Sequence, residues 1–190
     1  MKSRRFIATL PALGLISLLA ACATPPGAGS GDPLNRHALV RQASPEPDWP
    51  ALHERLATAT AGVRGIELGP VDEAGLRMQI PVADGFASGK TDIRPSLASA
   101  LDALAPALAP EAGAAVKVIG HTDSQGSEMT NLQLSISRAE AVAEYLRQRG
   151  IALERLSADG HGEAEPLASN ATEEGRMRNR RVELILSRQP

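Results

Sequence analysis

The sequence has few of the residues on which nucleic-acid binders and disulfide-stabilised proteins depend. It contains one cysteine, so no disulfide can form within the chain. Its aromatic residues are two Phe, one Trp and one Tyr, and its 20 Lys and Arg residues do not outnumber its 22 Asp and Glu residues. Without a basic excess for phosphates or aromatic rings for base stacking, we expect no nucleic-acid partner. The scarcity of aromatics also argues against a large cofactor cage, and no cofactor is expected.

A basic segment followed by an apolar run opens the chain. Lys2, Arg4 and Arg5 precede apolar residues from Phe6 to Ala21, which is the arrangement of a secretory signal. As a helix these sixteen residues would span roughly 24 Å, which is less than the ~30 Å hydrocarbon core of a bilayer. We therefore expect residues 1–21 to be a signal peptide rather than a membrane-spanning helix.

The single cysteine, Cys22, directly follows Leu19-Ala20-Ala21 at the end of this run. These four residues resemble the lipobox of bacterial lipoproteins, in which signal cleavage leaves a lipid-modified cysteine as the first residue. The alternative is an incidental cysteine after an ordinary signal peptide, but an exported cysteine without a partner would be a free reactive thiol. The resemblance implies acylation of Cys22 and effectively permanent anchoring. Ala23, in place of Asp, implies sorting to the outer membrane.

Proline and glycine are concentrated after the cysteine. Residues 22–50 contain six of the 14 prolines, a composition that buries little apolar surface and is typical of a linker. From residue 51 the hydrophobic pattern becomes periodic, and it predicts one domain over residues 63–190, preceded by a short helix at 51–62.

Within this domain the periodicity predicts two helices and five strands. The strands are expected at 63–68, 76–82, 116–120, 156–160 and 181–186, and the helices at 93–108 and 128–148. The order β-β-α-β-α-β-β predicts an α/β fold of the α+β type. We expect a two-layer sandwich in which helices cover one face of a mixed β-sheet.

Polar residues gather just after the predicted strand 116–120 and along the helix that follows it. Asp123 comes directly after the strand, while Asn131 and Arg138 lie seven residues apart on the helix and therefore point within about 20° of each other. If Asp123 and Arg138 face one cleft, they either form a salt bridge or receive a zwitterion. In the second case the carboxylate binds an ammonium group and the guanidinium binds a carboxylate. The residue pattern leaves both alternatives open.

Motifs in a fixed order, from about Leu76 to Ser187, resemble the OmpA-like peptidoglycan-associated domain family. They include Phe86-Ala87-Ser88-Gly89-Lys90, Ile93-Arg94-Pro95, Gly120-His121-Thr122-Asp123, Asn131-Leu132-Gln133-Leu134-Ser135, Gly160-His161-Gly162-Glu163 and Asn179-Arg180-Arg181-Val182-Glu183. The resemblance implies the family's β-α-β-α-β-β core.

The same resemblance implies a set of binding residues. In the family, the Asp after Gly-His-Thr and the Arg fifteen residues later hold the diaminopimelate side chain of peptidoglycan stem peptides, and these positions are Asp123 and Arg138 here. Thr122 and Asn131 match positions that line the same pocket.

Two further positions carry less definite expectations. Ala87 stands where members of the family often have Asp, so any contact with a ligand there would be made through the main chain. Arg180 belongs to the family's closing motif, which we expect to be mainly structural, with direct ligand contact as the alternative.

Together these features predict an outer-membrane lipoprotein, anchored on the periplasmic face, that binds peptidoglycan without covalent attachment and is not an enzyme. It would tether the outer membrane to the cell wall. An alternative is a module that binds other envelope proteins, as the Pal-like branch of the family does.

A second alternative is a metal-dependent hydrolase. His121-x-Asp123 and His161-x-Glu163 are two spaced pairs of metal-ligating residues, and residues i and i+2 of a strand share a face. The family resemblance favours the other interpretation, in which both histidines are loop or turn residues and no metal is bound.

Overall fold

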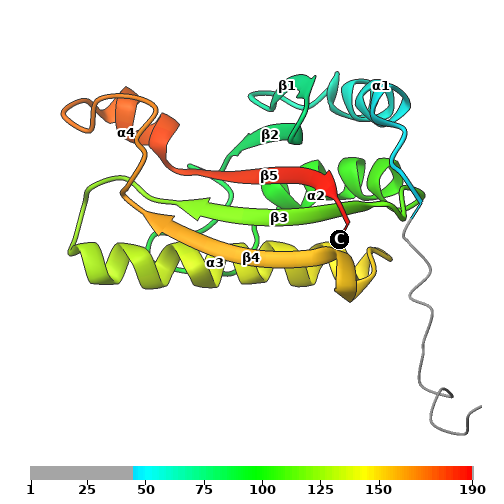
Figure 1. Ribbon diagram of the computed structural model, residues 1–190. Helices are drawn as coiled ribbons and strands as arrows, with labels where there is room; N and C mark the ends of the chain where they lie inside the picture. The colour runs from blue at the N-terminus through cyan, green and yellow to red at the C-terminus, as the bar shows by residue number, and fades with distance from the viewer. Residues whose placement is uncertain (1–44, 190) are drawn as a thin grey trace, which may run out of the picture. The chain divides into compact units, whose positions relative to one another are not determined.

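The computed structural model describes residues 45–189, in which five strands form one mixed sheet in the order β1-β2-β5-β3-β4 (Figure 1). The strands are β1 (Glu67–Asp72), β2 (Gly75–Pro81), β3 (Ala114–His121), β4 (Leu156–Gly162) and β5 (Arg181–Arg188). β3 and β4 are parallel, and the other three pairings are antiparallel. The last strand of the chain therefore lies in the middle of the sheet.

The helices confirm the predicted α+β arrangement. They are α1 (Trp49–Thr60), α2 (Pro95–Leu108), α3 (Glu128–Gln148) and α4 (Glu173–Asn179), with a short 3-10 helix, η2 (Leu153–Arg155). α2 and α3 cover the same face of the sheet, and α1 packs against α2 (Figure 1). The opposite face of the sheet carries polar side chains.

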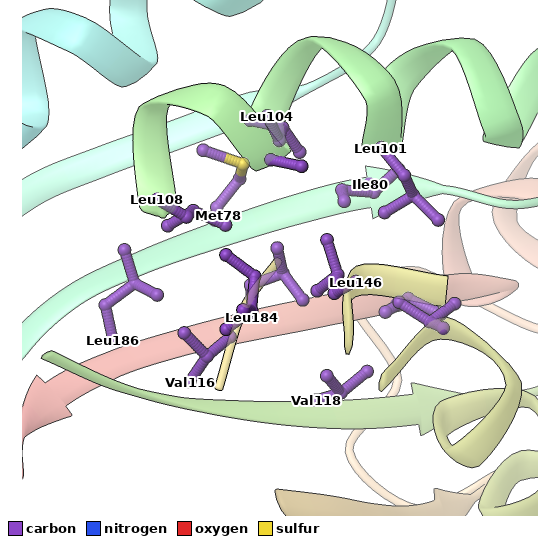
Figure 2. Close-up of a cluster of buried hydrophobic side chains, with 14 of the residues drawn as sticks. Met78, Ile80, Leu101, Leu104, Leu108, Val116, Val118, Leu146, Leu184 and Leu186 are labelled. Atoms are coloured by element: carbon purple, nitrogen blue, oxygen red, sulfur yellow. The ribbon is translucent and has the colours of Figure 1, made fainter. Parts of the chain in front are cut away.

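A single apolar cluster fills the space between the sheet and the helices (Figure 2). Alternate residues of each strand point into it, because successive side chains of a strand face opposite sides. The central members are Met78, Ile80, Val116, Val118, Leu184 and Leu186 from the strands and Leu101, Leu104, Leu108 and Leu146 from the helices. Full burial of one such aliphatic side chain contributes about 1.5–3 kcal/mol, so this cluster is the main source of stability.

The first hairpin differs from its predicted position. We expected the first strand at 63–68, with Gly69-Pro70 and Gly75 between the two strands, but β1 runs from Glu67 to Asp72 and contains Gly69-Pro70, where the pairing with β2 is irregular. The turn instead follows Asp72, whose Oδ1 accepts hydrogen bonds from the backbone N–H groups of Ala74 (2.8 Å) and Gly75 (3.1 Å). Gly75 has a φ of 124°, which suits glycine. The glycine and proline therefore mark a β-bulge rather than a turn.

The end of the predicted linker packs against the domain. α1 begins at Trp49 rather than at residue 51, because Asp48 caps it by accepting a hydrogen bond from the Ala51 N–H at 3.1 Å. Pro47 is buried, and the Asp48 N–H donates to Glu111 Oε1 at 3.2 Å. The predicted signal peptide, Cys22 and the linker up to residue 44 lie outside the described residues.

No helix within residues 45–189 combines the length and the apolar character that a membrane crossing requires.

The first half of α3 differs from its predicted burial. The apolar pattern predicts that Leu132 faces the core, but its side chain is 38% exposed, and the buried residues in this half are Asn131, Ser135 and Arg138. This half of the helix lies beyond the apolar cluster, over the carboxyl ends of β3 and β4 (Figure 1). Its buried face is therefore polar.

Glycines at the ends of β3 and β4 allow α3 to approach the strand backbone. A Cβ atom at Gly120 would overlap the Ser135 carbonyl oxygen, and one at Gly160 would overlap the Ser135 side chain and the Ile136 backbone. Ser135 Oγ accepts a hydrogen bond from the Gly162 N–H at 2.9 Å. Helix and strands are thus in direct backbone contact, which fixes the position of the first half of α3.

Because of this contact, the addition of one methyl group at Gly160 should reduce stability. Gly160→Ala must push α3 away from β4, so we expect it to lower the free energy of unfolding by about 1–3 kcal/mol, the usual cost of overpacking, in urea titrations. Gly62→Ala is the matched control, because no atom lies within 4 Å of the position that its Cβ would occupy. Equal stability of the two variants would contradict the close-packing argument.

Candidate functional site

One end of the sheet brings together segments that are far apart in the sequence. β3 and β4 end there, α3 begins there, and α4 leads into β5 (Figure 1). A cavity of about 430 Å³ lies at this end. Five of the predicted binding residues line it, namely Thr122, Asp123, Asn131, Arg138 and Arg180, together with residues of the connection between β2 and α2. Ala87 does not line the cavity, but its carbonyl oxygen contacts Arg138.

Asp123 is held in the loop after β3 by hydrogen bonds to both of its oxygens. Oδ1 accepts from the Gln125 N–H at 3.0 Å, and Oδ2 accepts from Arg180 Nη1 at 2.6 Å. Arg180 also donates through Nη2 to Glu173 Oε1 at 2.9 Å. Asp123 is 6% exposed, and its carboxylate retains acceptor capacity because a carboxylate offers about four lone-pair sites.

Arg138 lines the same cavity from α3, is buried, and forms hydrogen bonds only with neutral groups. It is 7% exposed. Nε donates to the Lys90 carbonyl at 3.1 Å, Nη2 donates to the Ala87 carbonyl at 3.3 Å, and the guanidinium lies 5.0 Å from the centre of the Phe86 ring. Burial lowers the pKa of Arg138, and the charge of Asp123 opposes this effect. Among the described residues, Arg138 forms no ion pair with Asp123 or with any other acid.

Asn131 and Thr122 join the loop after β3 to its surroundings. Asn131 Nδ2 donates to the Asp123 carbonyl at 3.2 Å and to Glu163 Oε2 at 2.7 Å, so it links the loops that follow β3 and β4. The Thr122 N–H donates to the Gly162 carbonyl at 2.8 Å. The hydroxyl of Thr122 is buried and has no hydrogen-bond partner within residues 45–189.

The four residues of the hydrolase alternative do not converge on one metal site. β3 ends at His121, so the alternation expected to place Asp123 on the same face stops there. His121 and His161 stack edge to face, with ring centres 5.3 Å apart, on the side of the sheet opposite the apolar core. Asp123 and Glu163 bond to Arg180 and Asn131 instead. The described part of the chain contains no group of three or more His, Cys, Asp or Glu residues arranged to hold a metal ion.

His121 is a strand residue that sequence reasoning assigned to a loop. It is 1% exposed, and neither ring nitrogen has a hydrogen-bond partner within residues 45–189. Its Nε2 lies 3.8 Å from Glu183 Oε1, but Glu183 already accepts from Arg181 Nε at 2.8 Å. Burial, reinforced by the positive charge of Arg181, lowers the pKa of His121 to about 4. The imidazole is therefore neutral at pH 7.

Arg94 is the charged residue of this cavity that was not among the predicted site residues. It lies directly before α2 and lines the same cavity as Asp123 and Arg138. The motif Ile93-Arg94-Pro95 was visible in the sequence, but its only evident role was to start a helix. The charge of its middle residue is the signal that would have identified it.

Comparison with known proteins identifies related domains. The model of the OmpA family matches residues 85–180. The "probable lipoprotein YiaD" of Escherichia coli (strain K12) is 42% identical over 102 residues, which cover 54% of this chain and 47% of YiaD. The "peptidoglycan-binding protein ArfA" of Mycobacterium tuberculosis is 49% identical over 74 residues, 39% of this chain and 23% of ArfA. The chain thus spans less than half of the length of these curated relatives.

A solved structure resembles most of the described fold. It is the cell wall anchor of the T6SS from Pseudomonas aeruginosa, with a TM-score of 0.62 and 30% sequence identity. The similarity covers 75% of this chain and 100% of the solved chain.

The buried His121 predicts a specific pH dependence of stability. Its pKa is about 4 in the folded chain, below the ordinary 6.5, so between these values the unfolded chain binds a proton that the folded chain does not. The free energy of unfolding should therefore fall as the pH drops from about 6.5 to 4, by up to about 3 kcal/mol from this residue.

Urea titrations at pH 7 and pH 4.5 measure this effect. His121→Gln should reduce the difference between the two pH values, whereas His53→Gln in α1 should leave it unchanged. Proton NMR titration of the His121 ring in the unmodified chain provides a check that does not depend on folding of the variant. Titration near pH 6.5 would contradict the burial argument.

Proposed function

The chain belongs to the OmpA family, and we propose that its residues 63–190 bind the free amino-acid end of the diaminopimelate side chain in a peptidoglycan stem peptide. Two relatives support this proposal by name, one being a peptidoglycan-binding protein and the other a cell wall anchor. The ligand would be bound without chemical change, so the proposed function is attachment rather than catalysis.

The observation that carries the proposal is the buried guanidinium of Arg138 with only neutral partners. A buried charge is costly unless it is paired, and the two carbonyl oxygens and the Phe86 ring compensate only part of that cost. Two of the five guanidinium N–H groups donate to the main chain, and the others are free to bind a carboxylate in a bidentate pair. A ligand carboxylate would complete the environment of this side chain.

Asp123 supplies the complementary charge. Its carboxylate accepts one hydrogen bond from Gln125 and one from Arg180, which leaves lone pairs for the N–H groups of an ammonium ion. The end of a diaminopimelate side chain carries an ammonium and a carboxylate group on one carbon atom, so it matches this pair of charges. In this proposal Asn131 and Thr122 position the Asp123 loop, and Ala87 acts through the carbonyl that orients Arg138.

The N-terminal segment would convert binding into a mechanical link. We propose that residues 1–21 are removed as a signal peptide and that lipidated Cys22 fixes the chain to the periplasmic face of the outer membrane. The part of residues 22–50 that precedes the packed segment before α1 would serve as the linker, and α1, which begins at Trp49 rather than at residue 51, would add a helix to the domain. The name of the relative YiaD as a lipoprotein supports this part of the proposal.

Single sites are expected to bind weakly, because exposed ion pairs contribute only about 0.2–1 kcal/mol and the cavity is partly open to solvent. The strength of attachment would come from the number of sites that bind at the same time. Many anchored copies face one polymer, so the effective concentration of sites is high and overall avidity exceeds the affinity of any single site.

Removing either charge tests the proposed site. Asp123→Asn and Arg138→Gln should each abolish co-sedimentation of the full chain, in detergent, with purified diaminopimelate-type sacculi. The loss in binding free energy should lie between about 1 kcal/mol, as for an exposed ion pair, and about 3–5 kcal/mol, as for a desolvated one, which corresponds to a fall in affinity of about fivefold to more than about a hundredfold.

The matched controls are Asp159→Asn and Arg149→Gln, which remove the same charges from ion pairs with Lys117 and Asp102, outside the cavity. They should bind sacculi normally, and all four variants should keep the circular dichroism spectrum of the parent chain. Undiminished binding by both cavity variants would refute the zwitterion site.

The proposed anchor has its own test. Cys22→Ser should prevent incorporation of labelled palmitate and remove the chain from the outer-membrane fraction, because each buried CH₂ of an acyl chain contributes about 0.8 kcal/mol to membrane binding. Ala28→Ser, a small change in the same segment, should alter neither property. A Cys22→Ser chain that stays in the outer membrane would contradict the lipobox interpretation.

A further inference from the structure

We propose that Arg94 binds a second carboxylate of the ligand, close to the free amino-acid end, and thereby selects stem peptides whose carboxyl groups are not amidated. This inference rests on the proposed function, because it concerns the same cavity. It adds a specificity-determining residue. It also implies that the ligand has a net negative charge, whereas a zwitterion has none.

The backbone of Arg94 is held in one conformation, so its side chain starts from a fixed position beside the cavity. The residue is extended (φ −83°, ψ 160°) and stands directly before Pro95, the first residue of α2. Its N–H donates to the Gly85 carbonyl at 2.9 Å. Arg94 lines the cavity and is exposed to solvent, and its side chain forms neither an ion pair nor a hydrogen bond with residues 45–189.

The charges around the cavity do not balance. Three of the lining side chains are arginines, Arg94, Arg138 and Arg180, and Asp123 is the one acidic side chain among the described lining residues. Arg180 is already neutralised, since it donates to Asp123 at 2.6 Å and to Glu173 at 2.9 Å. Arg94 and Arg138 have no acidic partner in contact, so the cavity holds two unmatched positive charges.

This imbalance defines the ligand. A zwitterionic end would place its carboxylate on Arg138 and its ammonium on Asp123, and it would leave the charge of Arg94 unmatched. A ligand with one ammonium and two carboxylates matches every charged group. The net positive charge of the cleft also attracts such an anionic ligand from a distance. The chemical class is therefore an acidic peptide with a free amino-acid end.

The cavity also has space for more than that end. Its volume of about 430 Å³ lies within the range of small-ligand pockets, about 300–1,000 Å³. In a tripeptide stem, the glutamyl α-carboxyl and the carboxyl of diaminopimelate at the end of the peptide chain are the candidates for the second group.

Two synthetic probes separate the contribution of the second carboxylate from that of the amino-acid end. The first is L-alanyl-γ-D-glutamyl-meso-diaminopimelate with all carboxyl groups free. The second has the glutamyl α-carboxyl and the peptide-chain carboxyl of diaminopimelate as primary amides, and it keeps the free amino-acid end. Calorimetric titration of the full chain in detergent micelles gives the Kd for each probe.

The unmodified chain should bind the free acid about two- to fivefold more tightly than the amide, the range expected for a partly exposed ion pair. Arg94→Gln should bind both probes with the affinity of the unmodified chain for the amide. The control Arg64→Gln removes the same charge at an exposed residue outside this cavity and should retain the preference. The preference for the free acid over the amide should also decrease as salt is added, because salt screens an exposed ion pair.

Two results would overturn the inference and leave the proposed function in place: equal binding of both probes by the unmodified chain, or an unchanged preference in Arg94→Gln. Failure to bind either probe is a different result. It would reject the proposed function, and the role of Arg94 with it.

Discussion

Direct backbone contact between α3 and the carboxyl ends of β3 and β4 is the constraint on which the candidate site depends. Gly120 and Gly160 leave no side chain between helix and strands, and Ser135 binds the Gly162 N–H across the contact. The buried face of the helix is polar at this level because it meets backbone rather than the apolar core. The contact therefore holds Asn131 and Arg138 at fixed positions beside the loop that carries Asp123.

The two central charges are kept apart by separate sets of partners. Asp123 is bound by Arg180 and by a backbone N–H, whereas Arg138 is bound by two carbonyl oxygens. A direct pair between them would neutralise both charges and remove the reason for a ligand to bind. The arrangement leaves a buried cation without an anionic contact in the described part of the chain. We interpret this local cost in stability as a requirement of binding.

The sequence predicts this structure best where a pattern is long. Residues 128–148 were predicted as a helix with correct bounds, because six turns of periodicity leave little ambiguity. The pattern failed at Leu132, since periodicity records where apolar residues recur and not where the core ends. Gly69-Pro70 suits a bulge as well as a turn. The spacing of Asp123 and Arg138 left two alternatives open, and the structure excludes a direct salt bridge between them, because Asp123 pairs with Arg180 and Arg138 bonds to two carbonyl oxygens.

The entry to β5 explains why the closing motif has both a structural and a cavity-lining role. Arg180 follows α4 as its C-cap and lines the cavity, whereas Arg181 is the first residue of β5 and binds Glu183. Arg181 also donates to the Glu165 carbonyl at 3.2 Å, in the loop after β4. One dipeptide therefore secures the loops after both β3 and β4. Because β5 lies in the middle of the sheet, these loops are fixed to a strand that is hydrogen-bonded on both sides, and the geometry of the cavity follows from the sheet order.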